Sequence, residues 1–167
     1  ISNSHLRYVN RAAKDILIEN GGVMKESLLI AETLNSIGKK SELDGSIIRL
    51  ALSIDGELAK NDRSNEFEPA WHFEKISINN IKSITNSAYN ILKKKGEIIA
   101  FADLFKMIKQ LDLFFNKQPT LELIKSCLCI DHRLRETKDG WGLMEWRTIN
   151  PRSIRDKVII ILRKNGN

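Results

Sequence analysis

The side chains whose types and spacing best suit chemistry are cations, and three of them lie in one short segment. Arg133, Arg135 and Lys138 fall within six residues of one another. The arginine guanidinium is a planar fork that bonds phosphate oxygens, so arginines on the outer side of a hairpin can contact a nucleic-acid backbone. A structural interpretation competes for Arg133, which can instead pair with Asp131 or Glu145.

Other cations lie where a DNA-binding helix and its preceding linker are expected. Arg49 and Lys125 fall in these helices, and one cation per helix is a thin supply for reading base edges. We therefore expect contacts with the phosphate backbone to dominate. The complete set of candidate nucleic-acid-binding residues is Lys39, Lys40, Arg49, Lys117, Lys125, Arg133, Arg135 and Lys138.

Metal binding and catalysis find little support in the sequence. Cys127, Cys129 and His132 resemble metal ligands, but residues 127 and 129 cannot share a helix face and no second cysteine pair exists. We expect one of these cysteines in the core and the other partly exposed. The chain has no P-loop, dinucleotide glycine fingerprint or metalloprotease motif. We expect no enzymatic activity, catalytic residue, metal or cofactor.

The elements that position the basic segment read as a short helix followed by a β-hairpin. Leu121, Ile124 and Leu128 recur at helical spacing. The segment 138–140, Lys-Asp-Gly, supplies the turn, because Asp-Gly adopts the positive φ that tight hairpins need. Residues 141–146 return as the second strand, and this arrangement is typical of the C-terminal half of a winged helix-turn-helix.

The same landmarks recur along the chain and predict a repeat. Residues 13–17, 88–92 and 158–162 share an apolar helical pattern, and each is followed by a glycine, at Gly21, Gly96 and Gly166. Residues 52–58 likewise parallel 128–134, and Trp71 parallels Trp141. We expect a mainly α fold with small β-hairpins, as tandem winged helix-turn-helix domains: repeat 1 over 1–79, repeat 2 over 80–150, and the first helix of a third, truncated repeat over 151–167.

Within each repeat, helical spacing predicts a second helix over 24–34 and over 101–111. The third helix of repeat 1 is expected to be capped by Asp44 or Ser46, and Pro119 to open the third helix of repeat 2. Short links are expected at 78–80 and 149–151.

The tryptophans are expected on the strands of the hairpins. For Trp71 and Trp141 we favour packing of the hairpin onto the helices over stacking on a base. Trp146 is left open between these two roles.

The run Asp131-His132-Arg133-Leu134, then Lys138-Asp139-Gly140-Trp141-Gly142-Leu143 and Glu145-Trp146, resembles the signature of the HARE-HTH winged-helix domain, with specificity across residues 81–150. That domain is found at the N-terminus of the bacterial RNA polymerase delta subunit. His132 stands where the family usually has Gly, and Leu134 where it often has Phe. The repeated arrangement is similar to the C-terminal part of bacterial sigma-factor-like helix-turn-helix DNA-binding proteins, which implies a role in transcription.

Composition agrees with an acidic polymer as partner. The net charge is +6 and the pI about 9.4, which favours a polyanionic partner. No apolar run is long enough to span a membrane. The two neighbouring cysteines are poorly placed to bond each other and favour a reducing compartment, so we expect a cytoplasmic location. Because the chain starts at Ile1 without Met, we expect a fragment.

The sequence therefore predicts a non-enzymatic module that binds duplex DNA in transcription, mainly through phosphate contacts. The alternative is a protein-interaction module that docks on RNA polymerase or another transcription component. A basic stripe across both repeats would favour DNA, whereas a mosaic of both charges with an exposed apolar patch would favour docking.

Overall fold

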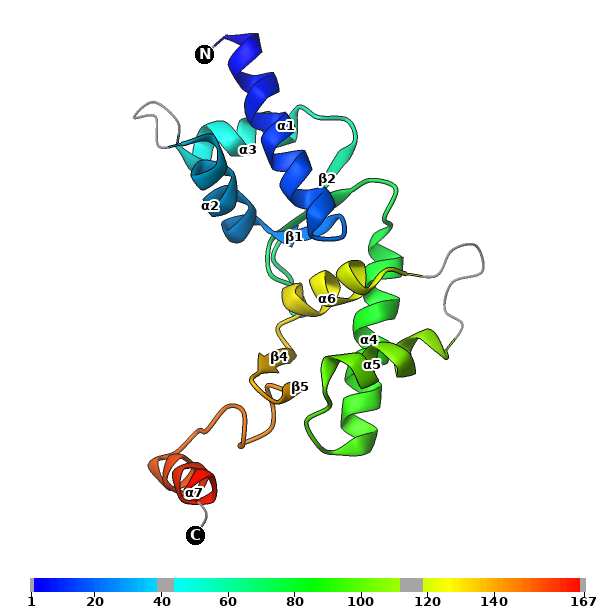
Figure 1. The fold of residues 1–167 in the computed structure, drawn as a ribbon, viewed down its shortest axis with the longest axis vertical. Coiled ribbons are helices and arrows are strands. Elements are labelled where there is room, and N and C mark those ends of the chain that lie inside the picture. Colours follow the sequence, from blue (N-terminus) through cyan, green and yellow to red (C-terminus); the bar gives the residue numbers. More distant parts are fainter. Residues whose placement is uncertain (1, 39–43, 112–118, 166–167) are drawn as a thin grey trace.

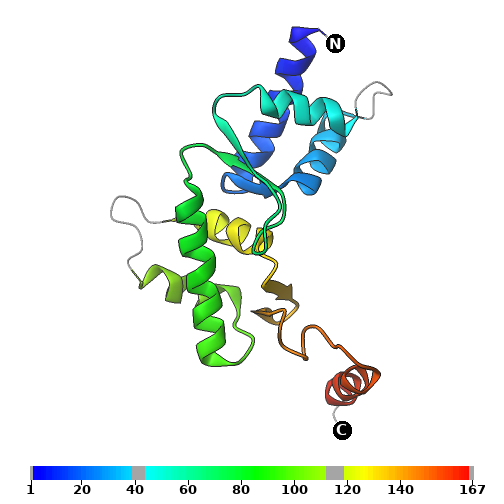
Figure 2. The same cartoon turned by 180° about the vertical axis from the view of Figure 1, so that it is seen from behind.

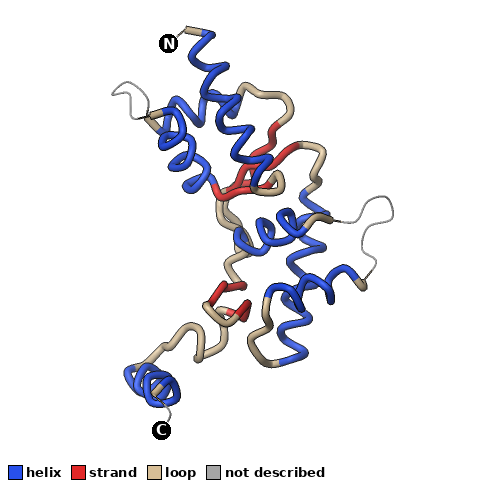
Figure 3. Tube along the Cα trace, viewed as in Figure 1, coloured by secondary structure: helices blue, strands red, loops and turns tan. Residues whose placement is uncertain are grey.

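A computed structural model describes residues 2–38, 44–111 and 119–165. This part of the chain is mainly helical with two small antiparallel sheets (Figures 1 and 3), which confirms the fold class at that level. The elements in order are α1 (Asn3–Glu19), β1 (Val23–Lys25), α2 (Glu26–Ile37), α3 (Gly45–Ser53), β2 (Leu58–Asn61), β3 (Ala70–Phe73), α4 (Ile78–Lys95), α5 (Phe101–Lys109), α6 (Leu121–Ile130), β4 (Leu134–Thr137), β5 (Gly140–Leu143) and α7 (Ile154–Lys164).

The first half of the chain (residues 1–79) packs α1 against α2 and α3. The predicted apolar stripe of α1 is buried at Val9, Ala13 and Leu17. Asp44 caps α3, because its carboxylate accepts hydrogen bonds from the N–H groups of Ser46 and Ile47. The expected Asp44 cap is therefore confirmed.

One element of the first half was not expected. The sequence placed a helix from residue 24, but residues 23–25 form β1 and the helix begins at Glu26. Strand β1 pairs with β3, with Met24 opposite Trp71, in a sheet of order β1-β3-β2. Three residues are too few to show an alternating pattern, so the hydrogen bonds to β3 decide their conformation.

The second half (residues 80–150) packs α4 against α5, α6 and β5. Its core holds Ile84, Ala88 and Leu92 of α4, which follow the predicted stripe. Strands β4 and β5 form the expected hairpin. Ile99 makes a single antiparallel bridge to Trp141, at the edge that β1 occupies in the first half.

Three sequence expectations about boundaries are wrong. Residues 78–80 are the first turn of α4 and not a link, because the side chain of Ser77 caps that helix. Pro119 precedes the N-cap residue Thr120 and so lies outside the helix. Trp146 lies in the turn after β5 and is half-buried. Trp71 and Trp141 are on strands and buried, which confirms core packing for both.

The loop between β2 and β3 joins the two halves. Phe67 is 1% exposed and belongs to the core of the second half. On either side of it, the N–H of Glu68 donates to the carbonyl of Ile130, and the N–H of His132 donates to the carbonyl of Glu66. Figures 1 and 2 show this loop lying beside the end of α6. This acidic loop is therefore fixed to the other half.

A glycine makes a second close contact between the halves. Gly21 has φ of +77°, and a Cβ at this position would overlap the backbone of Leu123 at the start of α6. The neighbouring carbonyl of Asn20 accepts a hydrogen bond from the hydroxyl of Ser126. Gly21 thus allows the left-handed backbone at the end of α1 and leaves room for the close approach of α6.

Helix α7 covers residues 154–164, within the segment where the sequence predicts a helix. None of its residues is buried, and four large apolar side chains are exposed: Ile154, Val158, Ile161 and Leu162. No helix among the described residues is long and apolar enough to cross a membrane.

Gly21→Ala should destabilise the protein more than Gly96→Ala. Gly96 also has a left-handed backbone, with φ of +70°, but a Cβ there meets nothing within 4 Å. Both changes add backbone strain of about 1–2 kcal/mol, and overlap with Leu123 should add roughly 1–3 kcal/mol for Gly21→Ala alone. Urea denaturation of the two variants measures the difference. Equal losses would contradict a tight α1–α6 contact.

Candidate nucleic-acid interface

The first predicted DNA-contacting cation, Arg49 on α3, is exposed but forms an ion pair within the protein. Its Nε lies 3.0 Å from Oε1 of Glu26, the first residue of α2. Oε2 of the same carboxylate accepts from Nε1 of Trp71 at 3.0 Å and lies 3.1 Å from Nζ of Lys60. Three donors from α3, β2 and β3 therefore converge on one acid at the start of α2.

The ionisation of Glu26 reflects this convergence. Burial of the carboxylate raises its pKa, but the hydrogen bonds from the three donors together outweigh that effect and hold the pKa below the ordinary value of 4.5. The charged form is therefore favoured in the folded protein. Arg49 therefore stabilises this acid, and its ion pair with Glu26 competes with any contact to a ligand.

The second half has a related cluster in which the cation keeps its place and the acid comes from another element. Lys125 on α6 takes the place of Arg49, and its Nζ lies 3.2 Å from Oε1 of Glu136 on β4. Phe101 opens α5 where Glu26 opens α2, and Lys125 lies over its ring. The acid of the cluster thus lies on helix α2 in the first half and on strand β4 in the second. Nε1 of the buried Trp141 has no hydrogen-bond partner among the described residues.

Arg133 makes the structural contact that competed with phosphate binding. Its guanidinium donates to both oxygens of Asp131, at 3.0 and 2.7 Å, and to Oδ1 of Asn86 at 2.8 Å. It also lies over the ring of Tyr89. The hydrogen bonds accepted by Asp131 raise the pKa of Arg133. The side chain ties the end of α6 to α4, which favours the structural interpretation.

The first half ties the same elements together with the opposite placement of charge. Asp55, just after α3, accepts hydrogen bonds from Asn10 and Lys14 of α1. Lys14 also lies 2.7 Å from Oε2 of Glu57. The cation is on the helix in the first half and beside the strand in the second.

Arg135 and Lys138 are exposed, and the described part of the chain offers neither an ion-pair partner. Thr137 pairs with Gly140, so the loop of the hairpin is Lys138-Asp139, within the segment 138–140 where the sequence predicts the turn. Gly140 has φ of +140°, and a Cβ there would overlap the carbonyl of Ile99. The hairpin tip is thus held against the segment between α4 and α5.

The predicted site residues Lys39, Lys40 and Lys117 lie outside the described residues.

Charge is divided unequally along the sequence. Residues 1–79 hold 10 Lys and Arg against 12 Asp and Glu, residues 80–150 hold 12 against 8, and residues 151–167 hold 5 against 1. The prediction from the sequence used only the total net charge of +6. A count of charged residues in each repeat would have revealed this division. The exposed cations that the prediction left out of the site include Lys93, Lys94 and Lys95 in the last turn of α4, and Arg155, Lys157, Arg163 and Lys164 in α7.

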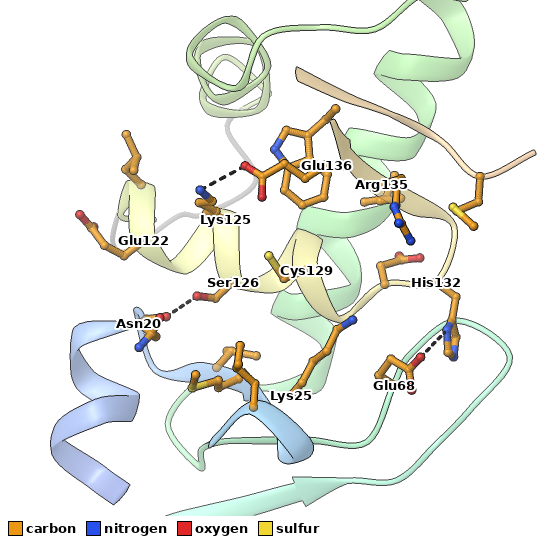
Figure 4. A pocket seen from close by; sticks show the side chains of 18 of the residues that line it. Asn20, Lys25, Glu68, Glu122, Lys125, Ser126, Cys129, His132, Arg135 and Glu136 are labelled. Atoms are coloured by element: carbon orange, nitrogen blue, oxygen red, sulfur yellow. Dashed lines mark hydrogen bonds and ion pairs between the residues drawn. The ribbon is translucent and has the colours of Figure 1, made fainter. Parts of the chain in front are cut away.

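A groove is lined by residues of α6, of the end of α1 and of β1. Its volume is about 590 Å³. Figure 4 shows Glu122, Lys125, Ser126 and Cys129 of α6 along one side of it, and Asn20 across from them. The helix expected to read DNA in the second half therefore faces the first half of the same chain.

The cysteines behave as one core residue and one exposed thiol, which confirms that expectation. Cys127 is buried and Cys129 is exposed to the groove. Burial raises the pKa of both thiols above the ordinary value, so neither is activated as a nucleophile. The described residues contain no group of three side chains placed to hold a metal ion.

Comparison of the chain with protein-family models, with curated proteins and with solved structures found no match.

Replacing Glu26 with Gln should lower stability at neutral pH but not in acid. Because the folded pKa of Glu26 is lowered, its charge stabilises the fold above about pH 4.5, and this contribution is lost as pH falls through the folded pKa. The gap between wild type and Glu26→Gln should close on acidification. Urea denaturation at pH 7, 5, 4 and 3 tests this.

The exposed Glu97 has no ion-pair partner among the described residues, so Glu97→Gln is the matched control and should change little at any pH. A gap for Glu26→Gln that stays constant from pH 7 to pH 3 would contradict the electrostatic role of this carboxylate.

Proposed function

We propose that this protein is a non-enzymatic module that binds duplex DNA through its phosphate backbone and acts in transcription. The observation that carries the proposal is the uneven charge: the excess of cations lies entirely in residues 80–167, and the exposed cations there include those on the hairpin tip, the end of α4 and α7. Cations that are not held in ion pairs can neutralise phosphates and release counterions.

The arrangement of elements supports tandem winged helix-turn-helix domains over 1–79 and 80–150, with α7 as the start of a third repeat. Each half runs helix, extended segment, two helices and hairpin. The equivalent positions Arg49 and Lys125 each bind an acid beside a buried strand tryptophan. The resemblance of residues 81–150 to the HARE-HTH domain agrees with this division and with a cytoplasmic role in transcription.

We propose that the protein recognises the shape and charge of the DNA more than its base sequence. Arg49, Lys125 and Arg133 already bind Glu26, Glu136 and Asp131, and the cost of release is greatest for Arg133, because its partner Asp131 is buried. Arg135 and Lys138 have no such cost and are the proposed phosphate contacts of the hairpin.

Docking on RNA polymerase or another transcription component is the alternative. The groove beside α6 favours it, because its walls carry both signs of charge and include the exposed apolar side chains of Leu28 and Leu121. Such a mosaic is more typical of a protein contact than of a phosphate contact.

The double change Arg135→Glu and Lys138→Glu should weaken binding to unrelated duplexes by similar factors. Phosphate contacts carry no direct sequence information, and losing two of them should make the log–log slope of affinity against salt shallower by about 2. Titration of a labelled duplex at several salt concentrations measures both quantities.

Arg7→Glu with Arg11→Glu is the matched control, since it makes the same charge change on the exposed face of α1. Equal weakening by the two double variants would show that only net charge matters. Absence of binding by wild type at low salt would overturn the DNA proposal and favour protein docking.

A further inference from the structure

The indole N–H of Trp141 is a buried donor without an acceptor. Trp141 is 1% exposed, and its Nε1 has no hydrogen-bond partner among the described residues. In the first half, the equivalent Nε1 of Trp71 donates to Oε2 of Glu26 at 3.0 Å. A buried donor without an acceptor costs free energy, and folded proteins contain few of them. The second half thus lacks the acceptor that the first half provides.

Phe101 stands where the first half has its acid. It opens α5 as Glu26 opens α2, so that helix offers no carboxylate to Trp141. The two positions are equivalent, because Ile99 bridges to β5 two residues before Phe101 and β1 pairs with β3 two residues before Glu26. The change from acid to phenyl ring leaves the N–H unpaired.

Glu136 decides which kind of acceptor suits this N–H. It lies opposite Trp141 on the hairpin, in the register position that Lys60 holds in the first half. Its carboxylate is 3.2 Å from Nζ of Lys125, and the pair together carries no net charge. What the cluster lacks is therefore a neutral acceptor and not an anion. Both side chains are about half exposed, and an ion pair at the surface contributes little stability, so it can open to admit a ligand.

Trp141, Lys125 and Glu136 all line the groove beside α6. The volume of about 590 Å³ is within the usual range of ligand sites. Its walls include the exposed side chains of Leu28 and Leu121. An occupant that fits these walls has apolar side chains as well as a neutral acceptor.

The unpaired charges of the groove have opposite signs at its two ends. Glu122 lies at one end and Arg135 at the other (Figure 4), and the described residues give neither an ion-pair partner. A polypeptide can present a basic residue to Glu122, an acidic residue to Arg135 and a main-chain carbonyl between them. DNA carries charge of one sign and fits this groove less well.

We propose that the groove binds a segment of a partner protein, and that a main-chain carbonyl of this segment accepts the hydrogen bond of the Trp141 N–H. An apolar side chain of the segment lies against Leu28 and Leu121, with a basic residue toward Glu122. The site goes beyond DNA binding, because the carbonyl contact does not involve the proposed phosphate contacts of the hairpin.

Proton NMR of the indole N–H groups tests the contact on the whole chain without DNA. The probe is N-acetyl-leucine N-methylamide, which carries neutral carbonyls and an apolar side chain. It should move the Trp141 resonance downfield in a saturable way. The Trp71 resonance should stay in place, because that N–H already donates to Glu26. Replacing each tryptophan in turn with Phe assigns the resonances.

Trp141→Phe keeps an aromatic ring and removes the N–H. It should weaken binding of the probe by about three- to tenfold, as for the loss of one hydrogen bond. The main-chain resonances of Val23 and Met24, which line the groove, report this affinity. Trp146→Phe is the matched control, since Trp146 is half-buried and lies outside the groove. Equal weakening by the two variants would overturn the proposal.

Glu136→Lys tests the preference for a neutral acceptor. It gives the second half the cation that Lys60 supplies in the first half. Wild type should bind the amide probe more tightly than acetate, and the variant should bind acetate more tightly than the amide.

A pair of blocked peptides tests the acidic end of the groove. Acetyl-Lys-Gly-Leu-Gly-Gly amide should bind wild type more tightly than acetyl-Gly-Gly-Leu-Gly-Gly amide, and Glu122→Gln should remove the difference.

The absence of a saturable shift at Trp141 with the amide and with both peptides would overturn the proposal. A shift with acetate or inorganic phosphate in wild type that equals the shift with the amide would show an anion site and overturn it as well. A shift that grows with protein concentration in the absence of probe would show that a second copy fills the groove, against the partner assignment. These experiments contain no DNA, so they can fail while the DNA proposal stands, and the reverse holds.

Discussion

The insertion of Phe67 into the core of the second half is the contact on which the rest of the arrangement depends. It brings the backbone of the β2–β3 loop against the end of α6, where two main-chain hydrogen bonds join residues 66–68 to residues 130–132. Those bonds hold α6 beside β1 and the end of α1. The groove exists because of this docking, and one wall of it belongs to each half. A loop that looks like an acidic, solvated wing is thus the connection that fixes the geometry of the molecule.

The two halves hold the end of the third helix to the first helix with ion pairs whose cations come from different elements. An acid at the end of the third helix, Asp55 or Asp131, must be held to the first helix. In the first half the cation comes from that helix, as Lys14, and in the second it comes from beside the strand, as Arg133. In the pairs Glu26–Arg49 and Glu136–Lys125 the cation is on the third helix of each half, and the acid comes from the second helix in one half and from the strand in the other. The equivalent elements are thus held together while the residue that carries the partner charge changes, so a residue-by-residue match of charge between the halves would miss part of their similarity.

The sequence was sufficient for elements with many periodic residues and insufficient for those set by a few long-range contacts. The stripes on α1, α4 and α6, the Asp44 cap and the buried tryptophans followed from spacing and residue type. Strand β1 did not, because three residues carry no pattern and their conformation depends on β3. Burial of Phe67 did not, because its neighbours in sequence are polar and acidic. The candidate cations were chosen from their place in the chain, and ion pairs such as Arg49–Glu26 link residues far apart in it.

These pairings change how the net charge of +6 should be understood. A cation that binds a half-buried acid contributes to the sum but offers little to a ligand, since releasing it leaves the acid unpaired in a poorly hydrated place. The first half, with more acids than bases, uses its cations in this way at Lys14, Arg49 and Lys60. The hairpin tip and α7 place their cations on exposed surface. Charge is therefore divided along the molecule, since the half with more acids and the basic helix α7 lie at opposite ends of it (Figure 1).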